Sequence, residues 1–342
     1  MSGRGRSTPG WAALAALLLA LSGCGGNDSS TGSEETAAPS GTATQEEVGG
    51  TVRLYTSYNQ PEVDALVAAY ASVEPDVSLE VFRAPTGQLT ARIAAEERAG
   101  GVQADVLLLS DPLSMQQYAA QDLLLPWTPP EQDAVPEAAR TDTFWGVTTS
   151  NVVVVHRPGA APDSWQDLTA SRYQDKVALP DPSFAGSAFG ALGYFAFADG
   201  YGLDFYQQLK DNGAVQVQAP GDVITGVAEG RFEAGMTLDF LARTAVANGS
   251  PLEIAAPDPG AVELYAPVGV FATTPNSAAA QSFAGFLLTR PAQEELAKLD
   301  RTPIRSDVPP LAPAVDEVVP DWPRIFENQA ELQADYRAIF GG

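Results

Sequence analysis

The central part of the chain alternates between strand patterns and helical patterns, and this alternation limits the possible folds more than any other feature. Strands are predicted at 51–55, 77–82 and 106–109, the last being a continuous apolar run of the kind buried inside parallel sheets. Apolar residues at helical spacing predict one helix after Pro61 and another over 86–98. The order strand, helix, strand, helix, strand predicts an α/β unit with right-handed crossovers.

A second series of the same kind follows an apolar run at 152–155. Its predicted elements are a strand at 177–179, a helix after Ser187, a strand near 234–238, a helix ending at Gly249 and a strand at 252–255. The pattern then returns to the first type, with a strand at 268–271 and helices at 278–288 and 292–299. The 342 residues are therefore expected to form two α/β units.

The first 50 residues have the pattern of an export signal followed by a tether. Arg4 and Arg6 precede an apolar run over 11–21, which is too short to span a bilayer but suits a secretory signal. We predict a signal peptide over 1–23 and a flexible tether over 24–50, a segment rich in Gly, Ser, Thr and Glu without Lys or Arg.

Composition excludes several classes of function. The chain has 19 Lys and Arg against 43 Asp and Glu, a net charge of −24, and residues 51–342 alone carry −21, so nucleic-acid binding is not expected. Cys24 is the only cysteine and His156 the only histidine, which excludes intramolecular disulfides and zinc sites built from Cys or clustered His. No metal or other cofactor is predicted.

Ligands of open α/β sheets lie beyond the carboxyl ends of strands, so the residues directly after the predicted strands are the candidates for a site. Four such segments carry small hydroxyls or a carboxylate: 56–59, 110–111, 181–188 and 237–240. The third begins a helix with small residues, which leaves backbone N–H groups open to a phosphate or carboxylate. The alternative is that Ser183 or Ser187 only caps that helix.

Several motifs of the chain occur together in one family. They are Val52-Arg53-Leu54-Tyr55-Thr56-Ser57, Ala104-Asp105-Val106-Leu107 before Ser110-Asp111, Gln121-Asp122-Leu123-Leu124-Leu125-Pro126-Trp127, the Gly186-Ser187-Ala188 step after Asp181-Pro182, and Arg290-Pro291-Ala292-Gln293-Glu294-Glu295-Leu296. With these motifs the chain resembles the solute-binding proteins of bacterial ABC importers, in the family for ferric iron, thiamine, polyamines, phosphonates and sugar phosphates. The ending Leu21-Ser22-Gly23-Cys24 similarly resembles a lipobox, in which the cysteine carries a lipid. This resemblance implies that 24–50 comprises a lipid anchor on Cys24 and the flexible tether.

The resemblance implies the fold of a type II periplasmic binding protein. Two α/β lobes are joined by two hinge strands and close on a ligand held between them. We expect lobe 1 to comprise 51–150 and 270–342 and lobe 2 to comprise 151–269, with hinges near 148–155 and 264–271.

Iron-binding members of the family hold the metal with two adjacent tyrosines, a histidine and an acidic residue. The tyrosine positions hold Asp239 and Phe240 here, the histidine position holds Asn59, and the acidic residue is Asp111. Two carboxylates without a phenolate are a poor ligand set for ferric iron, so ferric-iron binding is kept only as an alternative.

The predicted contact residues therefore form two charged or polar groups, one for each end of a ligand, with neutral hydrogen-bonding residues between them. Asp111 and Asp239 would bind an ammonium or hydroxyl end, and the start of the helix would bind a phosphate, phosphonate or carboxylate end, which predicts a small polar organic solute. The remaining predicted contacts are Thr56, Ser57, Asn59, Ser110, Ala185, Gly186, Ser187 and Ala188. Each aspartate is equally well explained as a helix N-cap, and Tyr58, Trp145 and Phe184 line either the cleft or the core.

The expected partners are a small solute, the permease and ATPase of an ABC importer, and the membrane through the lipid on Cys24. The protein is predicted to be a monomer, outside the cytoplasm, on the outer face of the cell membrane. A lipid-anchored hydrolase is the enzyme alternative, but there is no Gly-x-Ser-x-Gly motif, and the folded part has no cysteine. A sensor or adhesion lipoprotein with the same fold remains a third possibility.

Overall fold

The computed structural model describes residues 48–313 and 315–341, all of which belong to one compact unit. Its first part alternates strands and helices, as the sequence predicts. The elements are β1 Gly50–Thr56, α1 Gln60–Ala71, β2 Val77–Arg83, α2 Thr86–Arg98, β3 Val106–Leu108 and α3 Pro112–Ala119. Short 3-10 helices follow at Gln132–Ala134, Glu137–Ala139, Trp165–Thr169 and Ser171–Tyr173.

The middle of the chain begins with a long strand and ends with another. Its elements are β4 Phe144–His156, β5 Val177–Pro180, α4 Gly186–Phe197, α5 Leu203–Asp211, β6 Val215–Val217, α6 Pro220–Ala228, β7 Ala234–Leu238, α7 Asp239–Ala247, β8 Glu253–Ala255 and β9 Ala261–Val270. The last part contains α8 Ser277–Phe286, α9 Arg290–Lys298, β10 Thr302–Pro303, β11 Glu317–Val318, α10 Trp322–Glu327 and α11 Gln329–Phe340.

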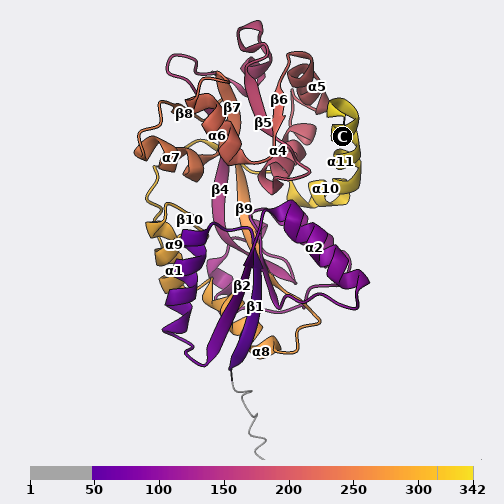
Figure 1. Cartoon of the computed structure of the whole chain (residues 1–342), viewed down its shortest axis with the longest axis vertical. Helices are drawn as coiled ribbons and strands as arrows, with labels where there is room; N and C mark the ends of the chain where they lie inside the picture. The colour runs from indigo at the N-terminus through magenta and orange to yellow at the C-terminus, as the bar shows by residue number, and fades with distance from the viewer. Residues whose placement is uncertain (1–47, 314, 342) are drawn as a thin grey trace, which may run out of the picture. The chain divides into compact units, whose positions relative to one another are not determined.

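In the described part of the chain, eleven strands form one sheet, and its main path runs β2-β1-β3-β9-β4-β7-β5-β6. Pairing is parallel within β2-β1-β3 and within β7-β5-β6, whereas β9 and β4 are antiparallel to each other and to their outer neighbours. Figure 1 shows β4 and β9 side by side between these two parallel groups. The segment 148–155, predicted as a hinge, lies within β4, and the segment 264–271 lies within β9 except for its last residue. The α/β fold is confirmed.

Helices cover the faces of the sheet and bury its strands. Figure 1 shows α1 and α9 on one side of β1 and β2 and α2 on the other. Almost every residue of β4 and β9 is buried, as expected for strands in the middle of a covered sheet. Among the described residues, no helix combines the length and the apolar character needed to cross a membrane.

The C-terminal helix α11 packs against α4 and α5. The Tyr336 ring lies edge-on to Tyr206 of α5 at 5.4 Å, and its hydroxyl accepts a hydrogen bond from Gln216 of β6 at 3.1 Å. The sequence analysis placed 270–342 with the first lobe, yet this helix contacts elements from 151–269. The lobe boundaries therefore stay a prediction. The segments predicted as the signal peptide and most of the tether lie outside the described residues.

Candidate binding site

A cavity of about 600 Å³ lies where several loops and helix starts meet. This volume is typical of sites for small organic ligands. Its walls come from five parts of the chain: the segment 57–62, the segment 83–91 with Ser110, the loop 183–187, the segments 218–221 and 238–241, and Arg301. The segments 57–62 and 83–91 and Ser110 belong to the predicted lobe 1. The segments 183–187, 218–221 and 238–241 belong to the predicted lobe 2.

Four helices begin at this cavity. Asn59 before α1, Thr86 of α2, Gly186 of α4 and Pro220 of α6 all line it. No side chain caps the start of α2 or of α4, so their first backbone N–H groups have no such partner. The N-terminus of a helix carries a partial positive charge, so the uncapped starts of α2 and α4 favour an anion in this cavity. The starts of α1 and α6 are already capped by the carboxylates of Glu62 and Asp222.

The charged side chains that line the cavity add to this preference. They are the guanidinium groups of Arg83 and Arg301 and the carboxylate of Glu62. Arg83 is exposed, whereas Arg301 is 3% exposed and Glu62 2%. The cavity thus carries excess positive charge, although the chain as a whole is at −24.

Arg301 reaches the cavity from the segment between α9 and β10. Its guanidinium lies 4.1 Å from the ring centre of Phe240 and 4.9 Å from that of Tyr58, and it donates a hydrogen bond of 2.9 Å to the Thr148 hydroxyl. Burial by itself lowers the pKa of Arg301, but the neighbouring Glu62 carboxylate raises it, and the net direction is upward. The side chain is therefore a permanent buried cation.

Six of the predicted contact residues line this cavity: Ser57, Asn59, Ser110, Ala185, Gly186 and Ser187. Ser57 donates a hydrogen bond of 3.3 Å to Ser110, which joins the loops after β1 and β3. The N-cap position of α4 is Ala185, so neither Ser183 nor Ser187 caps this helix. Tyr58 and Phe184 also line the cavity, whereas Trp145 is buried and donates to the Trp127 carbonyl at 3.3 Å.

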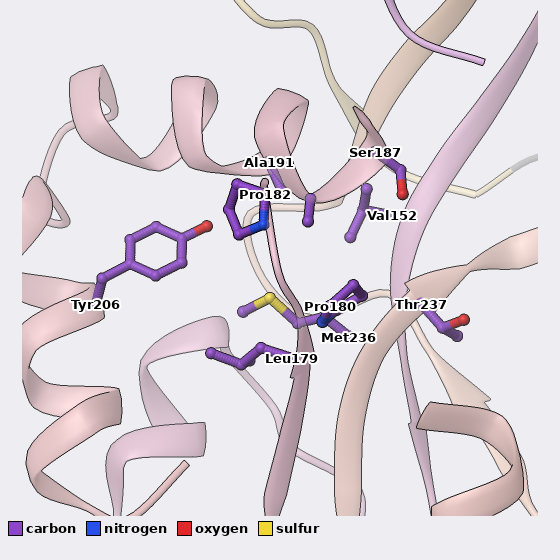
Figure 2. A pocket seen from close by; sticks show the side chains of 10 residues that line it. Val152, Leu179, Pro180, Pro182, Ser187, Ala191, Tyr206, Met236 and Thr237 are labelled. Atoms are coloured by element: carbon purple, nitrogen blue, oxygen red, sulfur yellow. The ribbon is translucent and has the colours of Figure 1, made fainter. Parts of the chain in front are cut away.

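Thr56 and Ala188 lie next to the cavity without lining it. The Thr56 hydroxyl is buried and accepts from the Tyr58 N–H at 3.1 Å. Ala188 lines a smaller pocket beneath α4, together with Ser187, Met236 and other mostly apolar residues (Figure 2). That pocket has a volume of about 10 Å³, too small for an organic ligand.

Asp111 and Asp239 do not line the cavity, and each has a different environment. One oxygen of Asp111 accepts the Ser114 N–H at 2.7 Å, so it caps α3, and the other oxygen has no hydrogen-bond partner. Asp239 accepts the Asn151 N–H at 3.1 Å and pairs with Arg243 at 2.8 Å. A ligand contact by either carboxylate stays a prediction, and the partners seen here are structural.

The sequence analysis did not identify Glu62, Arg83 and Arg301 as site residues. Each lies in an ordinary local sequence pattern. Glu62, for example, belongs to the first turn of α1, where its Oε2 atom accepts a hydrogen bond from the Asn59 N–H at 3.0 Å. Arg301 comes near Glu62 only through the folding of distant parts of the chain. No short-range signal distinguishes these residues from charged residues on the surface.

Comparisons with known proteins identify the family of the chain. The sequence model of the family described as bacterial extracellular solute-binding protein matches residues 52–298. A Haemophilus influenzae protein described as uncharacterized is 26% identical over 238 residues, which cover 64% of this chain and 67% of that protein.

Among solved structures, two relatives have different ligands. Iron-bound HitA from Pseudomonas aeruginosa is 18% identical with a TM-score of 0.72, covering 84% of this chain and 99% of that one. AfuA from Actinobacillus pleuropneumoniae, solved with fructose-6-phosphate bound, is 18% identical with a TM-score of 0.77, covering 85% and 98%. At such identity these structures establish the fold, with two lobes, and leave the solute of this chain open.

Because the family model covers well over half of the chain and the fold is that of a type II periplasmic binding protein, the chain belongs to the bacterial extracellular solute-binding proteins of ABC importers.

Proposed function

We propose that this protein binds a small organic solute that carries a phosphate or phosphonate group and delivers it to the permease and ATPase of an ABC importer. The single observation that carries the proposal is the 600 Å³ cavity at which four helices begin and two arginines meet one carboxylate. Such a site compensates the charge of an anionic group with fixed dipoles and guanidinium donors.

The rest of the cavity supports an organic body on the anion. Ser57, Asn59, Ser110 and Gln88 offer neutral hydrogen bonds, and Phe184, 47% exposed, offers an aromatic face at the wall. A bare phosphate ion would fill only a small part of this volume. A phosphorylated sugar or an aminoalkylphosphonate matches both the size and the charge.

The geometry does not favour amines or ferric iron. Since Asp111 and Asp239 do not line the cavity, an ammonium group would meet two arginines and only one carboxylate. Ferric iron needs several anionic oxygens, and the described residues contain no group of three or more His, Cys, Asp or Glu side chains able to hold a metal.

We also propose that a lipid on Cys24 holds the protein at the outer face of the cell membrane and that the protein acts as a monomer without catalysing a reaction. The relatives in the family are binding proteins of transporters, which supports the last point. Cys24 itself lies outside the described residues.

The melting temperature of the full chain in mild detergent tests the solute class. We expect 1 mM glucose 6-phosphate, fructose 6-phosphate or 2-aminoethylphosphonate to raise it, whereas glucose and putrescine leave it unchanged. A ligand at about 100 times its Kd adds roughly 2.7 kcal/mol of stability, which raises the melting temperature of a protein of this size by roughly 5 °C. Glucose is the matched control, because it differs from glucose 6-phosphate only in the anionic group. A rise with putrescine alone, or no rise with any phosphate or phosphonate, would contradict the proposal.

A further inference from the structure

The chain passes between the two predicted lobes a third time, through strand β11. Before this strand, α9 packs against α1 of the predicted lobe 1, and after it, α11 packs against α4 and α5 of the predicted lobe 2. β11 pairs with β9 at Ala261 and Val262, where β4 occupies the other edge of β9, so the three crossings lie side by side in the sheet. The third crossing is weakly attached, because only two residues of β11 pair with β9.

Side chains on one face of the sheet join the three crossings. Asn151 of β4 lies directly opposite Glu263 of β9 and therefore on the same face. Glu317 of β11 pairs with Ala261, two residues before Glu263, so it shares this face as well. The Asn151 amide donates a hydrogen bond of 2.6 Å across β9 to the Glu317 carboxylate. The Glu263 carboxyl lies within hydrogen-bonding reach of the same carboxylate.

The two carboxyl groups form a hydrogen bond only while one of them keeps a proton, because an ionised carboxylate has no hydrogen to donate. Glu263 keeps this proton. Its burial, the repulsion by the Glu317 carboxylate and the hydrogen bond between them raise the pKa of Glu263 from its ordinary value of 4.5 to about 7. Glu317 is exposed and Glu263 is half-buried, so water reaches the pair and the proton can exchange.

The other polar groups around Glu263 do not replace this proton. Asn151 is neutral, and among the described residues Glu317 is the charged side chain that acts on the pKa of Glu263. Asp239 of α7 accepts the Asn151 N–H at 3.1 Å, but its charge is paired with Arg243 at 2.8 Å. Two negative charges therefore face each other between β9 and β11 once the proton is lost.

We propose that the proton shared by Glu263 and Glu317 holds β11 against β9 in acidic and neutral surroundings, and that its loss above neutral pH releases this third crossing. The two carboxylates then repel each other, and a pairing of two residues offers little to oppose the repulsion. Release removes a restraint from the predicted hinge strands β4 and β9, so the pH of the surroundings sets how freely the hinge bends. The inference does not depend on which solute the cavity binds.

Raising the pH favours the released form of β11. While β11 is attached, Glu263 keeps its proton up to about pH 7, whereas in a released, hydrated segment it loses the proton near its ordinary pKa of 4.5. The attached form therefore binds more protons, and the equilibrium moves toward release as the pH rises from 4.5 through 7. Between pH 5 and pH 8, these two values allow a shift of the release equilibrium of up to about 70-fold.

Hydrogen–deuterium exchange of the ligand-free full chain in mild detergent tests the inference, read by mass spectrometry in peptides that contain 315–320 or Ala261. The Ala261 N–H donates to the Asp316 carbonyl at 2.8 Å and so reports on the attachment of β11. We expect these amides to exchange about tenfold faster or more at pH 8 than at pH 5, after correction for the intrinsic effect of pH on exchange. Peptides from β2, at the end of the sheet, should show no such change.

Glu263→Gln is the decisive variant, because its amide donates a hydrogen bond to Glu317 at every pH and carries no charge. We expect β11 of this variant to exchange about tenfold more slowly than that of the unaltered protein at pH 8 and at a similar rate at pH 5. Glu80→Gln, the same substitution at an exposed position of β2, is the control and should change neither rate. If Glu263→Gln does not fold, Glu317→Gln takes its place, because it keeps the acceptor for Asn151 and removes the other charge.

Two results would overturn the inference. One is exchange of β11 that depends on pH no more than exchange of β2 does. The other is a Glu263→Gln protein that folds and keeps the pH dependence of the unaltered protein, because another group then controls the segment. Neither result bears on the proposed function, since the experiment contains no solute.

Discussion

Asp111 is a buried residue whose effect on stability can be tested separately from its predicted contact with a ligand. It was predicted from its position after a strand, and the structure places it under the start of α4, where a side chain on Gly186 would overlap its carboxylate. Position in an α/β fold predicted the neighbourhood of this residue correctly. The sequence offered no way to decide between capping α3 and facing the cavity, because both need a carboxylate at the same place.

The pH dependence of stability should reveal this carboxylate. Burial raises the pKa of Asp111 from its ordinary value of 3.8 to about 6, although the Ser114 N–H lowers it in part. Between these pH values the folded protein binds more protons than the unfolded chain, so the contribution of Asp111 to stability decreases as the pH rises from about 4 to above 6. The difference between the two pKa values corresponds to roughly 3 kcal/mol.

Asp111→Asn keeps the hydrogen bond to Ser114 and removes the buried charge. We expect the variant to be more stable than the unaltered protein by roughly 2 kcal/mol at pH 7.5 and to differ little at pH 4.5, as measured by urea unfolding at both values. Asp239→Asn is the comparison, because it removes a charge that is paired with Arg243 and should destabilise the protein at pH 7.5. A stability difference for Asp111→Asn that is the same at both pH values would contradict the assignment.

At the scale of elements, the sequence predicted those whose pattern is local. The bounds of α2 and β7 agree with 86–98 and 234–238, because apolar spacing defines each of them. The sequence pattern predicted only 152–155 of strand β4, which is longer. The earlier part contains the buried polar residues Thr148, Ser150 and Asn151, which interrupt the apolar pattern of a strand. Two of these side chains have partners on distant segments: Thr148 accepts a hydrogen bond from Arg301, and Asn151 donates one to Glu317.

Helix α4 packs closely because of its glycines. A methyl group on Gly190 would overlap the side chain of Leu264 in β9, so we expect Gly190→Ala to destabilise the protein by roughly 1–3 kcal/mol, measured by urea unfolding. Gly221 in α6 is the matched control, because a methyl group there meets no atom within 4 Å and alanine favours a helix. Equal free energies of unfolding for the two variants would show that α4 can shift away from β9 without loss of stability, which would contradict the prediction.

At the scale of the whole molecule, the sign of the charge in the cavity is opposite to the net charge of the chain. The chain carries −24, yet the cavity combines four helix starts with two arginines, so the anion site that we propose lies within an acidic protein. The resemblance to the family predicted the fold, since motifs around strands are shared across it. The charged residues of the cavity come together only in three dimensions, so the proposed solute class depends on the structure.

The lipid on Cys24 is the remaining whole-molecule proposal. Because an acidic protein is repelled by anionic lipid headgroups, attachment must come from the acyl chains and not from charge. We expect Cys24→Ala to abolish incorporation of labelled palmitate and to move the protein from the membrane to the soluble fraction, which would lower uptake of the solute. The Kd for glucose 6-phosphate should stay within twofold, because a tether after an export signal contributes nothing to the cavity. Ser22→Ala keeps a small residue before the cysteine and should behave like the unaltered protein. Retention of Cys24→Ala in the membrane fraction together with normal uptake would contradict the anchor.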